Sequence, residues 1–116
     1  IYEAADCRVI LDASPATKGH VLILPKQHYA NMFEIDDELL AKAAKLAKNV
    51  ISDEKQLLGC DGYNVLQNNG EAAGQTVFHF HMHLIPRKAG DQAVPEWEHL
   101  SLSDDEMKEI CDKMKM

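Results

Sequence analysis

The sequence predicts one α+β domain, built on a mostly antiparallel sheet of about five strands with one long helix and a C-terminal helix. Short apolar runs bounded by Gly, Pro and Asn are typical of strands, and one long segment repeats apolar residues at helical spacing. The order strands, helix, strands, helix, with short turns between them, favours an antiparallel α+β arrangement. The chain of 116 residues has the length of a single domain, so residues 1–116 are assigned to one domain.

Two apolar segments near the N-terminus are predicted strands. CRVILD at 7–12 ends in an acid, and HVLILP at 20–25 is apolar and β-branched up to Pro25. The intervening ASPATKG at 13–19 contains Ser, Pro, Thr and Gly, which are typical of turns. A turn is therefore expected between the two strands.

The long helix is predicted at 33–59. Asp36 is the expected N-cap, and the acids Asp37 and Glu38 would interact favourably with the positive end of the helix. Gly59 is expected to end it. One buried stripe is predicted from the apolar residues that recur at helical spacing: Leu40, Ala43, Ala44, Ala47, Val50 and Ile51.

The second half of the chain is predicted to contain two strands and a helix: GYNVLQN at 62–68, VFHFHMHLIP at 77–86 and SLSDDEMKEICDKMK at 101–115. The segment NGEAAGQT at 69–76 is expected to be a loop, and 88–100 is expected to be irregular. Ser103 and Glu106 have the spacing of a capping box at the start of the last helix.

The composition argues against several classes of protein. There are 19 acidic and 12 basic residues, and this net charge of −7 is unfavourable for binding nucleic acid. The sequence contains neither a long apolar run nor a secretion signal. Cys7, Cys60 and Cys111 do not resemble a disulfide framework. We therefore expect a cytoplasmic protein that binds neither nucleic acid nor membrane, and we expect a further segment before Ile1.

The segment HFHMHLIPR at 79–87 places three histidines in alternation with apolar residues. In a strand, successive side chains point to opposite faces, and neighbours on one face lie about 6.6 Å apart. The histidines at 79, 81 and 83 would then share one face. The other face would enter the core with its apolar residues: Phe80, Met82 and Leu84.

Three interpretations of these histidines are open. The first is a half-solvated strand face, although such faces usually carry mixed polar residues. The second is a metal site, because His-x-His can place two nitrogens on one zinc ion. The third is acid–base and nucleophilic catalysis, in which a neutral imidazole attacks phosphorus and nearby donors stabilise the oxygens. Candidate donors lie just upstream, which favours the third interpretation: Asn68, Gly74, Gln75 and Thr76.

These motifs resemble those of the histidine-triad (HIT) family. The segment 79–85 matches the signature His-φ-His-φ-His-φ-φ, where φ is apolar, and 68–78 resembles the family's Asn…Gly-Gln-Ser/Thr approach to it. LDASPATKGHVLILPKQH at 11–28 resembles a second family block. The resemblance extends over about 9–87, and it implies the HIT fold and a nucleotide hydrolase or transferase that acts at the α-phosphate.

The resemblance also implies a role for each motif residue. His81 would attack the α-phosphate and form a nucleotidyl-histidine that water cleaves, while His79 would help to shuttle the proton of the leaving group. His83 would bind the phosphate, His20 would complete the polar cluster, and Asp12 would accept the ribose hydroxyls. The remaining implied nucleotide-binding residues are Ile10 and Leu11 at the base, and Asn68, Gly74, Gln75 and Thr76 near the phosphate. No metal is required for this chemistry.

The expected partner is a purine nucleotide: AMP, an adenosine phosphoramidate or a dinucleoside polyphosphate. Asn68 favours the Hint-like branch, whose members cleave adenosine phosphoramidates. The runs AGQTV and PRKAGD also resemble the Fhit branch of diadenosine polyphosphate hydrolases. The alternatives are therefore a Fhit-like hydrolase and a nucleotide-binding regulatory protein without turnover.

Two further expectations come from the resemblance. Many bacterial relatives bind a structural zinc through an N-terminal Cys-x-x-Cys, and His28, joined by His79, could serve such a zinc if this segment precedes Ile1. Family members are homodimers in which two sheets join into one continuous sheet. Trp97 would suit either such an interface or the local core.

Overall fold

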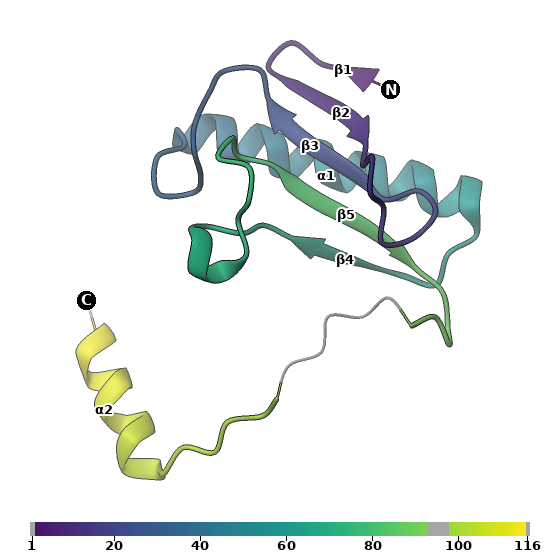
Figure 1. The fold of residues 1–116 in the computed structure, drawn as a ribbon. Coiled ribbons are helices and arrows are strands. Elements are labelled where there is room, and N and C mark those ends of the chain that lie inside the picture. The colour runs from purple at the N-terminus through teal and green to yellow at the C-terminus, as the bar shows by residue number, and fades with distance from the viewer. Residues whose placement is uncertain (1, 93–97, 116) are drawn as a thin grey trace.

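The computed structural model describes residues 2–92 and 98–115 (Figure 1). Five antiparallel strands form one sheet in the order β1-β2-β3-β5-β4. Their bounds are Tyr2–Glu3 for β1, Cys7–Leu11 for β2, Val21–Pro25 for β3, Gly62–Leu66 for β4 and Met82–Arg87 for β5. The predicted α+β fold class and antiparallel sheet are confirmed. The short edge strand β1 was not predicted individually.

Helix α1, Asp37–Leu58, covers one face of the sheet and closes the hydrophobic core (Figure 1). Its predicted caps at Asp36 and Gly59 are confirmed, but the helix begins at Asp37 and not at the predicted position 33, because the Asp36 cap ends the preceding turn. The Asp36 carboxylate accepts a hydrogen bond from the Leu39 N–H at 3.2 Å, which caps the first turn. Gly59 ends the helix in the left-handed conformation at φ 63°, with its N–H bonded to the Lys55 carbonyl.

The buried stripe of α1 differs in part from the prediction. Ala43 and Ala47 are buried as predicted, and three other predicted positions are partly buried against the core: Leu40, Val50 and Ile51. Ala44 is exposed, which corrects the prediction, and Leu39 is buried instead. Leu39, Ala43 and Ala47 follow a spacing of four residues, which lies along one helix face, whereas Ala44 is rotated by about 100° from Ala43.

The predicted strand at 77–86 is wrong at its N-terminal end. Strand β5 begins at Met82, and its ladder with β3 runs only from the pair Ile23–Met82 to the pair Val21–Leu84. The last two residues of β3 pair only with β2, so 77–81 has no ladder partner. The Phe80 N–H donates instead to the Tyr29 carbonyl at 2.7 Å.

The predicted alternation of burial is nevertheless confirmed across this boundary. The three histidines at 79, 81 and 83 are half-buried, whereas the residues between and after them are buried: Phe80, Met82 and Leu84. The segment 79–81 therefore keeps the two-residue period of burial without belonging to the sheet.

The C-terminal helix α2, Asp104–Met114, begins with the predicted capping box of Ser103 and Glu106. It lies away from the sheet and α1 (Figure 1), and every residue of 98–115 is exposed. Trp97 lies outside the described residues. No helix in the described part of the chain combines the length and apolar character that a membrane span requires.

Candidate active site

Asp12, His20 and His83 meet near the end of β2, the start of β3 and the N-terminal part of β5. Asp12 follows β2 directly and His20 precedes β3, so the antiparallel pairing of these strands brings the two residues together, with the Asp12 N–H bonded to the His20 carbonyl at 3.0 Å. His83 lies on β5, which pairs with β3 on its other side. The sheet register therefore gathers residues that are up to 71 positions apart in the sequence.

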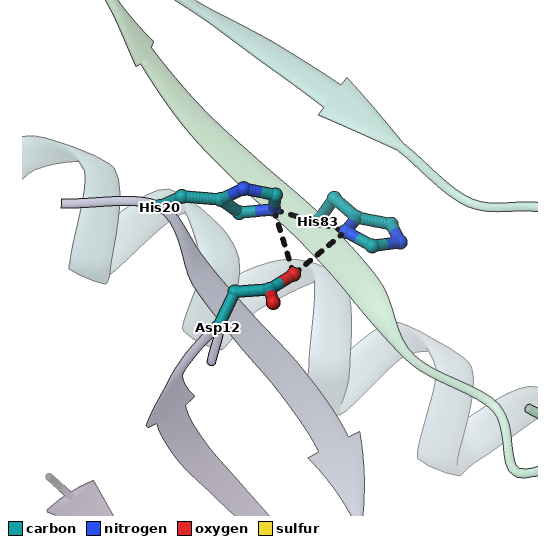
Figure 2. A group of neighbouring side chains, drawn as sticks. All are labelled: Asp12, His20 and His83. Carbon is teal, nitrogen blue, oxygen red and sulfur yellow. Dashed lines mark hydrogen bonds and ion pairs between the residues drawn. The ribbon is translucent and has the colours of Figure 1, made fainter. Parts of the chain in front are cut away.

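Asp12, His20 and His83 form a compact polar cluster (Figure 2). His20 Nε2 lies 3.0 Å from His83 Nδ1, and Asp12 Oδ2 lies 3.4 Å from His20 Nε2 and 3.8 Å from His83 Nδ1. His20 is buried, and the other two are half-buried. The predicted association of His20 with the triad is thus present in the geometry.

Backbone donors fix the proton positions in this cluster. The Ala16 N–H points at His20 Nδ1 at 2.9 Å, so this nitrogen accepts and neutral His20 carries its proton on Nε2. His20 Nε2–H can then donate to His83 Nδ1. Neutral His83 consequently carries its own proton on Nε2, where it is available as a donor.

His81 has the opposite arrangement. Its Nδ1 lies 2.7 Å from the His79 carbonyl oxygen, which can only accept, so neutral His81 carries its proton on Nδ1. The lone pair is then on Nε2. The His81 ring contacts that of His83 edge-on, with 5.0 Å between centroids. A ring held in one tautomer with a free nitrogen has the form required of a nucleophile.

His79 is engaged at both nitrogens. Its Nε2 donates to the Pro25 carbonyl at 2.8 Å, and its Nδ1 lies 3.0 Å from His28 Nδ1. A proton shuttle from His79 to a leaving group stays a prediction, and it would require one of these contacts to change. A metal-bound histidine characteristically donates its other N–H to a carbonyl, so the pair His28–His79 fits two ligands of a structural zinc.

The cluster of Asp12, His20 and His83 fits a metal less well. Among the described residues, these three bring metal-ligating atoms within 4.8 Å of one another. Two nitrogen or oxygen ligands of one tetrahedral zinc ion are expected to lie about 3.4 Å apart, which is near the distances between these atoms. Coordination through His20 Nε2, however, would place a proton on His20 Nδ1, directly against the Ala16 N–H. The hydrogen bonding therefore favours the metal-free cluster.

The residues expected at the base are exposed. Ile10 is 39% exposed and shares the face of His83, because the register aligns Ile10 with Leu22 and Leu22 with His83. Leu11 is 57% exposed, and strand alternation directs it toward the other face. The structure thus brings Ile10 into line with the cluster and not Leu11. Contact with a base stays a prediction for both.

The residues expected near the phosphate lie in one loop. Gly74 has a positive φ of 92°, and a Cβ built on it would lie 3.9 Å from Asn68 Nδ2, so these two residues are neighbours. Thr76 is exposed. Gln75 is buried, and its side-chain amide bonds to Ala30, Asn31, Gly70 and Val77. Contact of these residues with a phosphate stays a prediction.

Three groups that organise the site were not predictable from the sequence: the Ala16 N–H, the Pro25 carbonyl and the His79 carbonyl. Every residue except proline offers a backbone donor, and every residue offers an acceptor, so residue type carries no signal for them. Only the three-dimensional arrangement identifies which of them face an imidazole.

Burial lowers the pKa of His83, the neighbouring His81 and His20 lower it further, and Asp12 opposes these effects. Below a pH of about 6.5 the unfolded chain therefore binds a proton at His83 more readily than the folded chain does. When the unfolded chain binds more protons, the free energy of unfolding increases with pH. The folded protein therefore loses stability through His83 as the pH falls below about 6.5.

Replacing His83 by Gln removes this titration. We expect the free energy of unfolding of the wild type to decrease more between about pH 7.5 and about pH 5.5 than that of His83→Gln. Urea unfolding of both proteins at the two pH values measures the difference. Equal decreases would show that His83 is not responsible.

Comparison with known proteins identifies the family. The HIT domain family model matches residues 1–90. The adenosine 5'-monophosphoramidase hnt1 of Schizosaccharomyces pombe is 39% identical over 120 aligned residues, which cover 99% of this chain and 87% of that protein. Protein hit of Bacillus subtilis is 46% identical over 91 residues, covering 75% of this chain and 60% of that protein, so this chain spans less than two thirds of that relative.

The fold comparison agrees. The crystal structure of a HIT family protein from Bacillus anthracis has a TM-score of 0.88 and 32% sequence identity, covering 98% of this chain and 83% of that chain. The sequence match, the shared fold and the histidine cluster lead to one conclusion: this chain belongs to the HIT domain family.

Proposed function

We propose that this protein hydrolyses purine nucleotide conjugates at the α-phosphate, such as adenosine 5'-phosphoramidates, through a nucleotidyl-His81 intermediate that releases AMP. The observation that carries the proposal is the hydrogen bond from His81 Nδ1 to the His79 carbonyl, because it leaves Nε2 as the free nitrogen. The adenosine 5'-monophosphoramidase from Schizosaccharomyces pombe supports this substrate class.

The reaction would proceed in two displacements. In the first, the Nε2 lone pair of His81 forms a bond to the α-phosphorus, and the bond from phosphorus to the leaving amine breaks as the amine takes up a proton. In the second, water attacks the same phosphorus and releases a proton, which replaces the one taken up by the amine, and the bond to Nε2 breaks, which gives AMP and regenerates neutral His81. The His79 carbonyl stabilises the positive ring of the intermediate by holding its Nδ1 proton.

The cluster of Asp12, His20 and His83 would supply a hydrogen-bond donor to the phosphate and acceptors to the ribose. His83 Nε2–H can donate to a non-bridging phosphate oxygen, because His20 holds the other nitrogen of His83 as an acceptor. Asp12 Oδ1 accepts the Ser14 N–H at 2.8 Å. A carboxylate offers about four acceptor sites, so Asp12 retains capacity for the ribose hydroxyls that we propose it binds.

A structural zinc at His28 and His79 is a separate proposal. It would need two further ligands, which a Cys-x-x-Cys segment before Ile1 would supply. Such a zinc would bind the His79 side chain at Nδ1, and it would take no part in the displacement at phosphorus.

Release of AMP from adenosine 5'-phosphoramidate tests the proposed function. We expect release at an unchanged rate when excess chelator is added, because imidazoles and backbone groups supply the donors and the nucleophile. The measurement is AMP formation by chromatography, with and without chelator.

Three other outcomes would contradict the proposal in different ways. Activity that stops with chelator and returns with zinc would indicate a metal-dependent reaction. Cleavage of diadenosine polyphosphates alone would indicate Fhit-like specificity. AMP binding without turnover of either substrate would indicate a regulatory nucleotide-binding protein.

A further inference from the structure

The segment 77–81 carries two of the three triad histidines without support from the sheet ladder. Strand β5 begins only at Met82. Four contacts outside the ladder hold the segment: the Phe80 N–H on the Tyr29 carbonyl, His79 Nε2 on the Pro25 carbonyl, His79 Nδ1 on His28 Nδ1, and the side chain of Gln75 on the Val77 carbonyl. The geometry of His81 therefore depends on these contacts.

Gln75 is the most buried polar side chain next to this segment, with 2% exposure. Its Nε2 donates to the Ala30 carbonyl at 2.6 Å and to the Val77 carbonyl at 3.1 Å. Its Oε1 accepts from the Gly70 N–H at 2.8 Å and from Asn31 Nδ2 at 3.3 Å. One amide group thus connects three segments of chain around residues 30, 70 and 77.

These four contacts use the full hydrogen-bonding capacity of the side chain. A glutamine amide has two N–H donors and an oxygen with two lone pairs. Both donors of Gln75 face carbonyl oxygens, and its oxygen faces two donors. No side-chain group is left for a phosphate, so the nucleotide contact expected from the sequence would require this arrangement to open.

The contacts of Gln75 lie close to the tautomer of His81. The Gln75 side chain joins Val77 to Ala30. The Phe80 N–H bonds to the carbonyl of Tyr29, the residue before Ala30. His79 lies between these two anchors, and its carbonyl accepts the proton of His81 Nδ1. A shift of the segment would therefore rotate this carbonyl away from His81.

We propose that Gln75 is a positioning residue for the reaction: it fixes the segment 77–81 so that the His79 carbonyl holds His81 with Nε2 unprotonated. This role deepens the proposed function and rests on it. Gln75 does not touch the reacting atoms. Its effect is on the orientation and tautomer of the nucleophile.

The variant Gln75→Met tests the role, because methionine has a similar length and neither donates nor accepts like an amide. Gln56→Met is the matched control, since Gln56 is exposed on α1. We expect Gln75→Met to lower kcat about 100-fold, the typical effect of a small misplacement, with KM and AMP affinity nearly unchanged. The Gln56 control is expected to retain wild-type values.

A spectroscopic measurement separates positioning from general structural support. Nitrogen-15 NMR of the imidazoles is expected to show the Nδ1–H tautomer for His81 in the wild type and in Gln56→Met, and a mixture of tautomers in Gln75→Met. A folded Gln75→Met protein with the wild-type His81 tautomer and wild-type kcat would overturn the proposal. If the wild type has no turnover, the function fails, and the tautomer comparison alone decides the role of Gln75.

A measurement on the wild type covers the case in which Gln75→Met does not fold. The side-chain amide protons of Gln75 are expected to exchange slowly with water and to keep their chemical shifts when AMP is added. Rapid exchange, or a large shift with AMP, would show that Gln75 is a ligand-binding side chain and would overturn the proposal.

Discussion

The variant His81→Ala is expected to lose turnover by a factor of about 10⁴ or more, because removing the nucleophile disables the catalytic unit as a whole. Adenosine phosphoramidate hydrolysis under saturating substrate measures the loss. AMP binding is expected to persist, since His83 and Asp12 still present their polar groups. The fold is also expected to persist, because His81 is only half-buried and does not belong to the core cluster.

The variant His99→Ala is the matched control for this experiment. His99 is exposed and belongs to the segment before α2, which lies away from the sheet (Figure 1). It is expected to retain wild-type turnover. If His81→Ala retained substantial turnover while His83→Ala lost it, the assignment of the nucleophile to His81 would be wrong.

The variant Phe80→Ala is expected to reduce the free energy of unfolding by about 3–5 kcal/mol, the range for truncating a buried aromatic side chain. Phe80 has no exposed surface and lies in the core cluster beneath α1. The variant removes this ring between His79 and His81 without changing either histidine. Chemical denaturation followed by circular dichroism measures the loss.

Phe78→Ala is the matched control, because it removes the same side chain two residues earlier, where it is 49% exposed. A substitution at such a surface position usually changes stability by about 0.5 kcal/mol or less. Equal losses for both variants would contradict the alternation of burial on which the placement of the histidines depends.

Local signals explain why both helix ends were predictable from the sequence. The Asp36 cap, the Gly59 stop and the capping box at Ser103 each involve atoms within a few residues of one another. These contacts form wherever the local sequence allows them, so they can be read without knowledge of the fold. The alternation around Phe80 is local in the same sense.

The start of β5 was not predictable in this way. It depends on where the ladder of β3 ends, and the register that aligns Ile23 with Met82 joins segments that are far apart in the chain. A sequence with high strand propensity, such as 77–81, does not form a strand on its own, since strand formation requires a partner. The sequence pattern therefore gave the burial of this segment correctly and its hydrogen bonding incorrectly.

In the candidate site, too, some features were predictable from the sequence and others depend on contacts between distant segments. The residues of the cluster were predictable, because the resemblance to the HIT family implied a role for each of them, whereas the spacing of the histidines alone also allowed a metal site. The tautomers were not predictable, since they depend on backbone groups such as the Ala16 N–H and the His79 carbonyl. Gln75 was recognised as a motif residue, but its buried amide contacts follow only from the packing of three loops.

The backbone contacts also distinguish the two histidine pairs. His28–His79 leaves two Nδ1 atoms facing each other and uses a carbonyl to orient His79, which is compatible with zinc. His20–His83 is oriented by an N–H donor, which opposes metal coordination through His20 Nε2. The same residue type therefore supports different chemistry at two ends of one motif.

Trapping the covalent intermediate is the most direct test of the account. Wild-type protein is mixed with adenosine 5'-phosphoramidate, quenched rapidly under conditions that preserve phosphoramidate bonds, digested and analysed by tandem mass spectrometry. We predict one nucleotidyl group per chain on His81, absent from His81→Ala and formed as fast as turnover requires. AMP release with no adduct at any time, or an adduct on another residue, would contradict attack by His81.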